Sequence, residues 1–320
     1  MKLKPRIMAI FAALAVATLL GGCISKDAGI AQTQPTKTPS ATSADPVERY
    51  RAYLNTLDVA QIVSSGQAMA KLRELAGKDT KKNDEMFRVY NELYLSVITN
   101  QTETETEPDA AVKKVLEENG YVSVDSGEGT WTVAEKPGYM MQSFQGIVST
   151  EVAEYLAIVN KETAEAPVAV DGILSVPFAE LENRIITCET FVGKYKDAPE
   201  ASVIKTYLEN YVTQYLTARD FAIDVLYTDN VLTDEARQSY EHFVSTYPKS
   251  SFNGLVKGYL EVLKAHNYEL TDEVRQYLDD NQIDTSWFDM QAQQNGEDEP
   301  LPTGDVAEEE EQPLEEDGGQ

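Results

Sequence analysis

The sequence predicts a mostly α-helical protein, built as an irregular array of helical hairpins with one inserted β-hairpin and a disordered tail at each end. Three observations support this fold class. Apolar residues recur at helical spacing through most of residues 46–290. One block of sequence in the second half of the chain is repeated 52 residues further along. The segments on either side are too polar to form a packed core.

The first region, residues 46–175, contains helices with recognisable ends. Asp45, Pro46 and Glu48 form the N-cap, first-turn proline and capping-box acid of the first helix. Gly77 and the pair Asn119-Gly120 are typical of helix C-termini. Apolar spacing predicts further helices over residues 59–76, 83–99, 108–119 and 149–161.

One segment of this region predicts strands instead of helix. Residues 121–125 and 130–134 are rich in β-branched and aromatic residues, and the glycine-containing segment 126–129 separates them. This pattern predicts a β-hairpin. Because two strands alone are marginally stable in water, we expect Trp131 and Val133 to pack against the helix at 149–161.

The second region, residues 176–290, contains the internal repeat. Its two copies align without a gap and share an aromatic residue, a tyrosine and a Tyr-Leu pair: Phe191, Tyr195, Tyr207 and Leu208 in the first, Phe243, Tyr247, Tyr259 and Leu260 in the second. Each copy predicts a helix that ends at the first tyrosine, a polar turn and a second helix. Such hairpins need a neighbour to cover their apolar faces, as in repeat arrays.

The second copy resembles the tetratricopeptide-like hairpins of several bacterial lipoproteins, in which a Tyr-Pro-x-Ser corner, here Tyr247 to Ser250, joins the helices. The chain departs from that pattern in its 52-residue period, where about 34 is usual, and in Lys196, which replaces the proline in the first copy. More loosely, residues 176–278 are similar to uncharacterised helical lipoproteins of Gram-positive bacteria. The resemblance implies a fold and does not imply an activity.

Residues 1–22 resemble a lipoprotein signal peptide. A basic start is followed by an apolar run over residues 7–20, which is shorter than the ~20 residues that span a bilayer. Leu20-Gly21-Gly22-Cys23 resembles a lipobox. The resemblance implies cleavage before Cys23, acyl chains on that cysteine, and a location at the outer face of the cell membrane, or at the outer membrane in a Gram-negative cell. The alternative is an ordinary secretory peptide with a chance cysteine.

Composition restricts the partners of the body that follows. Residues 23–45 predict a lipidated, disordered tether, and residues 291–320 an acidic disordered tail whose role stays open. The whole chain carries a net charge of −27. This acidity argues against nucleic acid and against direct adhesion to anionic headgroups, so we expect contact with the membrane only through the lipid on Cys23.

We find no catalytic, metal or cofactor motif in the sequence. His242 and His266 are the only histidines, and neither has a second histidine at ligand spacing. Cys188 lies on an apolar helical stripe between Ile185 and Val192, which predicts a buried structural thiol. Paired carboxylates cannot be judged, because any two of 54 acids could meet by chance.

Tyr207, Tyr211 and Tyr215 follow one face of a predicted helix. They would form an aromatic groove for a peptide or glycan, or else pack between helices with their hydroxyls at the rim, and we favour packing.

These observations predict a membrane-anchored, extracytoplasmic lipoprotein that acts as a non-catalytic binding or scaffold module for a protein or peptide partner. Two alternatives stay open. One is an envelope hydrolase that uses carboxylates, and the other is a substrate-binding lipoprotein of a transporter. The second would need alternating strands and helices, which the sequence does not predict.

Overall fold

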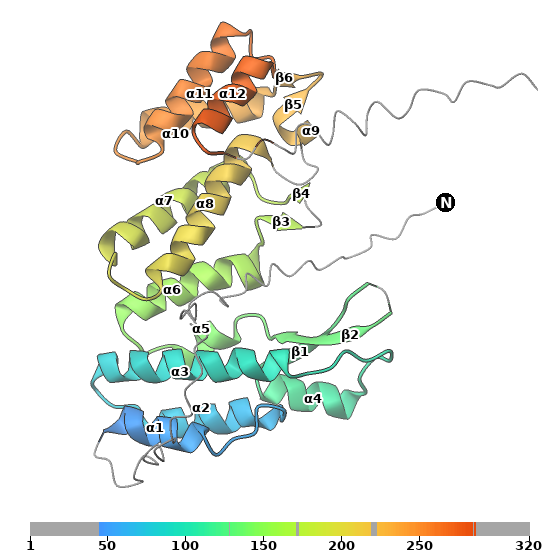
Figure 1. Ribbon diagram of the computed structural model, residues 1–320, viewed down its shortest axis with the longest axis vertical. Coiled ribbons are helices and arrows are strands. Elements are labelled where there is room, and N and C mark those ends of the chain that lie inside the picture. The colour runs from blue at the N-terminus through green and yellow to red at the C-terminus, as the bar shows by residue number, and fades with distance from the viewer. Residues whose placement is uncertain (1–44, 128, 171–172, 219–222, 284, 286–320) are drawn as a thin grey trace, which may run out of the picture.

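The computed structural model describes residues 45–127, 129–170, 173–218, 223–283 and 285. This part of the chain is mostly helical and forms an elongated stack of helices, as the fold class predicts (Figure 1). Cys23, most of the predicted tether and the acidic tail at 291–320 lie outside the described residues. Among the described helices, none is long and apolar enough to cross a membrane.

The helices of the first region begin close to their predicted starts. The Asp45 side chain accepts a hydrogen bond from the Val47 amide at 3.0 Å, which caps the first helix. The N-cap of the fourth helix is Asp109, one residue after the predicted start at Pro108. The helices of this region are α1 (Pro46–Leu54), α2 (Val63–Leu75), α3 (Thr80–Thr99), α4 (Ala110–Glu118), α5 (Tyr139–Phe144) and α6 (Thr150–Asn160).

The predicted β-hairpin forms from β1 (Tyr121–Asp125) and β2 (Trp131–Glu135), with Tyr121 opposite Glu135. The expectation that the hairpin packs against the helix at 149–161 is wrong for Trp131. The Trp131 ring lies 5.4 Å from the Lys113 ammonium of α4, and Trp131 also pairs with Thr104. The hairpin therefore packs on α3, α4 and the segment before α4, because β1 directly continues from α4 and turns back over it.

Two further hairpins were not predicted. They are β3 (Ala169–Val170) with β4 (Ile173–Leu174), and β5 (Tyr227–Thr228) with β6 (Val231–Leu232). Two-residue strands are too short to show an alternating pattern in a sequence. All three hairpins lie along the same side of the helical stack (Figure 1).

The second region contains the predicted helical hairpins, α7 (Phe178–Lys194) with α8 (Ala201–Thr217) and α10 (Asp234–Thr246) with α11 (Asn253–Ala265). Tyr195 and Tyr247 end the first helix of each pair. Each tyrosine amide donates to the phenylalanine carbonyl four residues earlier, at 2.8 and 2.9 Å. The two Phe–Tyr ring pairs have centroids 5.0 and 5.3 Å apart. The two copies of the 52-residue sequence repeat therefore fold into helical hairpins with the same Phe–Tyr corner.

Three short elements complete the described fold: the π-helical turn η1 (Lys161–Glu165) after α6, and α9 (Ile223–Leu226) and α12 (Asp272–Asp280) in the second region. In α12, Val274 and Leu278 are fully buried, while most other residues of the helix are polar. A last helix with a polar outer face is typical of the capping element of a repeat array.

Two hydrophobic cores stabilise the stack, and they meet at α6. Val152 and Leu156 belong to the first core, Ile158 belongs to the second, and Tyr155 packs against both. The boundary between the cores thus lies inside α6, upstream of the expected division between residues 175 and 176. The reason is that α6 has apolar residues on more than one face and can cover both neighbours.

Candidate functional site

The three tyrosines of α8 are mainly packing residues. Tyr211 and Tyr215 are each 1% exposed, and Tyr207 is half-buried. The Tyr211 hydroxyl donates to Glu162 Oε2 at 2.8 Å, and the Tyr215 hydroxyl lies 2.8 Å from Ser239 Oγ. Since two of the three rings are covered by the protein itself, they do not line a groove that a ligand could enter.

Cys188 is buried in the second core, as predicted. Burial raises the pKa of this thiol to about 12. The thiol therefore stays protonated at neutral pH, which is typical of a structural cysteine and not of a nucleophile.

His242 has a partner that the sequence did not reveal. Its Nδ1 lies 2.7 Å from Oε2 of Glu182, a carboxylate of α7 that is 2% exposed. Ser239 and Tyr215 also donate to this carboxylate, so one buried group joins α7, α8 and α10. The Ser239 hydroxyl meets the carboxylate and not the imidazole, so these residues do not form a nucleophile–base–acid relay.

His266 lies at the end of α11, with Nδ1 3.9 Å from Glu273. In the described ranges, no three histidine, cysteine or acidic side chains come together as a metal site would require.

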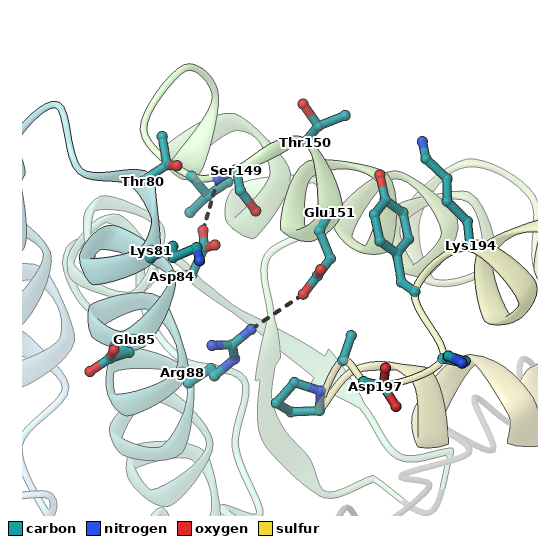
Figure 2. A pocket seen from close by; sticks show the side chains of 15 residues that line it. Thr80, Lys81, Asp84, Glu85, Arg88, Ser149, Thr150, Glu151, Lys194 and Asp197 are labelled. Atoms are coloured by element: carbon teal, nitrogen blue, oxygen red, sulfur yellow. Dashed lines mark hydrogen bonds and ion pairs between the residues drawn. The ribbon is translucent and has the colours of Figure 1, made fainter.

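The structure brings together a different site, a cleft of about 850 Å³ between three segments that lie far apart in the sequence. One wall is the first half of α3, the floor is the start of α6, and the other wall is the turn between α7 and α8 (Figure 2). The lining residues are Thr80, Lys81, Asp84, Glu85, Arg88, Val148, Ser149, Thr150, Glu151, Lys194, Tyr195, Lys196, Asp197, Ala198 and Pro199.

The floor of the cleft is held by paired charges. Arg88 of α3 contacts both carboxylate oxygens of Glu200, at 2.7 and 3.0 Å. Arg88 also lies 3.7 Å from Glu151 (Figure 2). Its hydrogen bond to Glu200 raises the pKa of Arg88. Because Glu200 lies at the start of α8, this two-point contact fastens the first core to the second.

The start of α6, at the floor of the cleft, is also held by hydrogen bonds. The Ser149 amide donates to Asp84 Oδ1 at 2.8 Å, and the Ser149 hydroxyl accepts from the Val152 amide. Ser149 is thus the N-cap of α6, and α3 holds it in position. Hydrogen bonds from α3 and within α6 therefore hold the floor of the cleft in place.

The rim of the cleft is different. Lys81 and Glu85 project from α3, and Lys196 and Asp197 belong to the opposite turn; all four are exposed. Within the described ranges their side chains make no ion pair or hydrogen bond. Lys194 is the exception on this rim, since it pairs with Glu154 at 2.8 Å. The cleft consequently presents free charges of both signs on two facing walls.

The residues of this cleft carry almost no signal in the sequence. Lys81 and Glu85 look like ordinary surface charges of an amphipathic helix, and Lys196 and Asp197 look like an ordinary polar turn. Only Lys196 carried a signal, because it replaces the proline of the second repeat copy.

No protein-family model, curated protein or solved structure matches this chain. Its class is therefore defined by the fold and the site described above, an array of helical hairpins with a charged cleft between its two cores.

Proposed function

We propose that this chain is a membrane-anchored extracytoplasmic binding module that holds a polar segment of a protein partner in the cleft between α3, α6 and the α7–α8 turn. The observation that supports this proposal is the contrast between the floor and the rim. The floor is held by hydrogen bonds and its charges are paired, whereas the rim offers unpaired charges of both signs.

The chemistry of the cleft favours a polypeptide over a small apolar ligand. Small-molecule pockets are lined mainly by hydrophobic and aromatic side chains. This cleft has a single aromatic lining residue, Tyr195, and its rim is charged. The basic side chains of a peptide segment would pair with Glu85 and Asp197. Its acidic side chains would pair with Lys81 and Lys196. Such complementarity selects partner and orientation.

The proposed lipid anchor at Cys23 would place the cleft close to the membrane. Asp45, the last residue of the predicted tether, is the first described residue, and its carboxylate lies 3.1 Å from the ammonium of Lys82. Lys82 is adjacent to Lys81 on the cleft rim, so the tether joins the body beside the cleft. With an r.m.s. reach of about 25 Å for a flexible segment of this length, a lipid on Cys23 would keep the cleft near the membrane surface.

The test compares two charge-reversed double variants in native membranes. Lys81→Glu with Lys196→Glu reverses the two free cations of the rim. Lys114→Glu with Lys205→Glu reverses two exposed lysines of α4 and α8 that do not line the cleft. We expect a protein that co-purifies with the wild-type chain to be lost from the rim variant and retained by the control. Equal retention by both variants would overturn the proposal.

A further inference from the structure

The pair of Arg88 and Glu200 joins two halves of the molecule that otherwise share few polar contacts. We call residues 45–148 the first half and residues 176–285 the second half. Between described residues, this pair is the only ion pair or hydrogen bond that links the two halves directly. The guanidinium contacts both oxygens of the carboxylate, which is the geometry of a strong, charge-assisted contact.

The second repeat copy shows that a hairpin of this kind does not require an acid at position 200. Glu200 is the N-cap residue of α8, and Phe252, 52 positions later, is the N-cap residue of α11. Phe252 packs against the second core. The Glu200 side chain does not cap its own helix, although acidic side chains commonly do so at this position. Its carboxylate reaches Arg88 of α3 instead.

This contact holds one wall of the cleft against the other. Glu200 directly follows residues 195–199, the turn that forms one wall, and Arg88 lies on the opposite wall (Figure 2). The Ala201 amide donates to the Ala198 carbonyl at 3.0 Å, so the turn is continuous with α8 and moves with Glu200. Because the Glu200 side chain is 6% exposed, its carboxylate depends on Arg88 for a partner.

The connection between the halves, α6 followed by η1, is fastened to a different half at each end. At its start, the Ser149 amide donates to Asp84 of α3. At its end, Glu162 of η1 accepts from Arg184 of α7 at 2.7 Å and from Tyr211 of α8 at 2.8 Å. The start of α6 therefore belongs with the first half, and η1 belongs with the second.

The junction of α6 with η1 is the place where this connection can bend. The α-helix ends at Asn160, and the π-helical turn begins at Lys161. Asn160 is 7% exposed, and its Oδ1 has no hydrogen-bond partner within the described part of the chain. Helices bend where their regular hydrogen-bond ladder is interrupted, and π-helical turns are frequent at functional sites.

We propose that the Arg88–Glu200 pair is a latch for the cleft, and that the junction of α6 with η1 is its pivot. While the latch is closed, the α7–α8 turn is held at α3 and the cleft stays narrow. When the latch opens, the second half rotates about the junction and the cleft widens. The latch thereby regulates access to the cleft, and this role in access rests on the proposed function, whereas the latch and the pivot do not.

Double electron–electron resonance measures the width of the cleft in the purified full-length chain, without a partner. Spin-labelled amino acids are placed at positions 81 and 196, which lie on facing walls. We expect Arg88→Gln and Glu200→Gln each to lengthen the mean distance between the labels and to broaden its distribution. The double variant should widen the cleft no further than the single variants, because both changes remove the same contact.

Two controls separate a latch from a general loss of structure. Lys194→Gln breaks the ion pair with Glu154 at the same cleft, and it should leave the distance unchanged because exposed pairs contribute little. Labels at positions 205 and 257, on α8 and α11, report on the second half alone. Their distance should stay the same in every variant, because the second half rotates as one body.

Three results would overturn the proposal: wild-type distances between positions 81 and 196 in both single variants, equal widening in Lys194→Gln, or an equal change between positions 205 and 257. If one single variant does not fold, the other still tests the latch, since each removes the same contact. The measurement needs no partner, and the variant Lys81→Glu with Lys196→Glu leaves the latch intact. Failure of the latch is therefore distinguishable from failure of the proposed function.

Discussion

At the scale of single residues, the structure separates charges that have partners from charges that do not. The carboxylates of Glu182 and Glu200 are buried, and each is matched by donors from neighbouring elements. Glu135 faces the core without such donors. A charge with a partner fixes two elements together, whereas a carboxyl without one makes the folded state sensitive to pH.

Replacement of Glu135 by glutamine tests this sensitivity. The pKa of Glu135 is about 7 in the folded chain, against 4.5 for a free side chain. The folded state therefore keeps a proton that the unfolded state loses, and the contribution of Glu135 to stability falls as pH rises from about 4.5 to 7. Above that window, Glu135→Gln should be more stable than wild type by about 2 kcal/mol.

Thermal unfolding of both proteins between pH 4 and pH 8 measures this difference. At pH 4 the two melting temperatures should be close, and at pH 8 the variant should melt at a higher temperature. A constant difference across the range would contradict the raised pKa.

At the scale of elements, the sequence predicted most helices because their ends and apolar faces are local. The cap by Asp45, the stop at Asn119-Gly120 and the repeated Phe–Tyr corner are all found where expected. The burial of Tyr211 and Tyr215 agrees with the favoured packing alternative. The short strands β3 to β6 were missed, because two residues carry no periodic signal.

The cleft and the core boundary could not be predicted for a different reason. The cleft joins residues 80–88, 148–151 and 194–199. These three segments lie far apart in the sequence, and only the last of them falls within the 52-residue repeat. Their proximity depends on how the helices stack, which local patterns do not contain.

Two glycines of α11 test how the last described helix, α12, packs on α11. A Cβ at Gly258 would lie 2.1 Å from the Tyr277 hydroxyl of α12, whereas a Cβ at Gly254 would meet nothing within 4 Å. Gly258→Ala should displace Tyr277 and break its hydrogen bond to the Leu255 carbonyl. Gly254→Ala in the same helix should be neutral or stabilising by up to about 1 kcal/mol.

Hydrogen exchange measures both variants locally. Amides of α12 should exchange faster in Gly258→Ala, and those of α3 should be unchanged. Unaltered exchange in α12 would show that its packing on α11 does not depend on this close approach.

At the scale of the whole molecule, two cores joined through α6 carry a cleft between α3, α6 and the α7–α8 turn. The three hairpins lie along one side of the helical stack (Figure 1). The strongly acidic chain has no described helix suited to span a membrane. We propose that its attachment to a membrane depends on the lipid at Cys23, because two or three acyl chains suffice for stable anchoring.

Substitution of Cys23 by serine tests the anchor. The variant should be exported but recovered from the soluble fraction, because it cannot receive the acyl chains, while the wild type stays with membranes. Fractionation followed by immunoblotting measures the distribution. A Cys23→Ser chain that remains in the membrane fraction would show that the signal segment or another part of the chain holds it there.

The most direct test of the proposed binding function is photo-crosslinking from the cleft in living cells. A photoreactive amino acid placed at position 81 or 196 faces the cleft, and one at position 114 or 205 does not. We predict that positions 81 and 196 crosslink to the same protein, and that positions 114 and 205 do not. Crosslinks of equal yield from all four positions, or none from the two cleft positions, would contradict a partner bound between α3 and the α7–α8 turn.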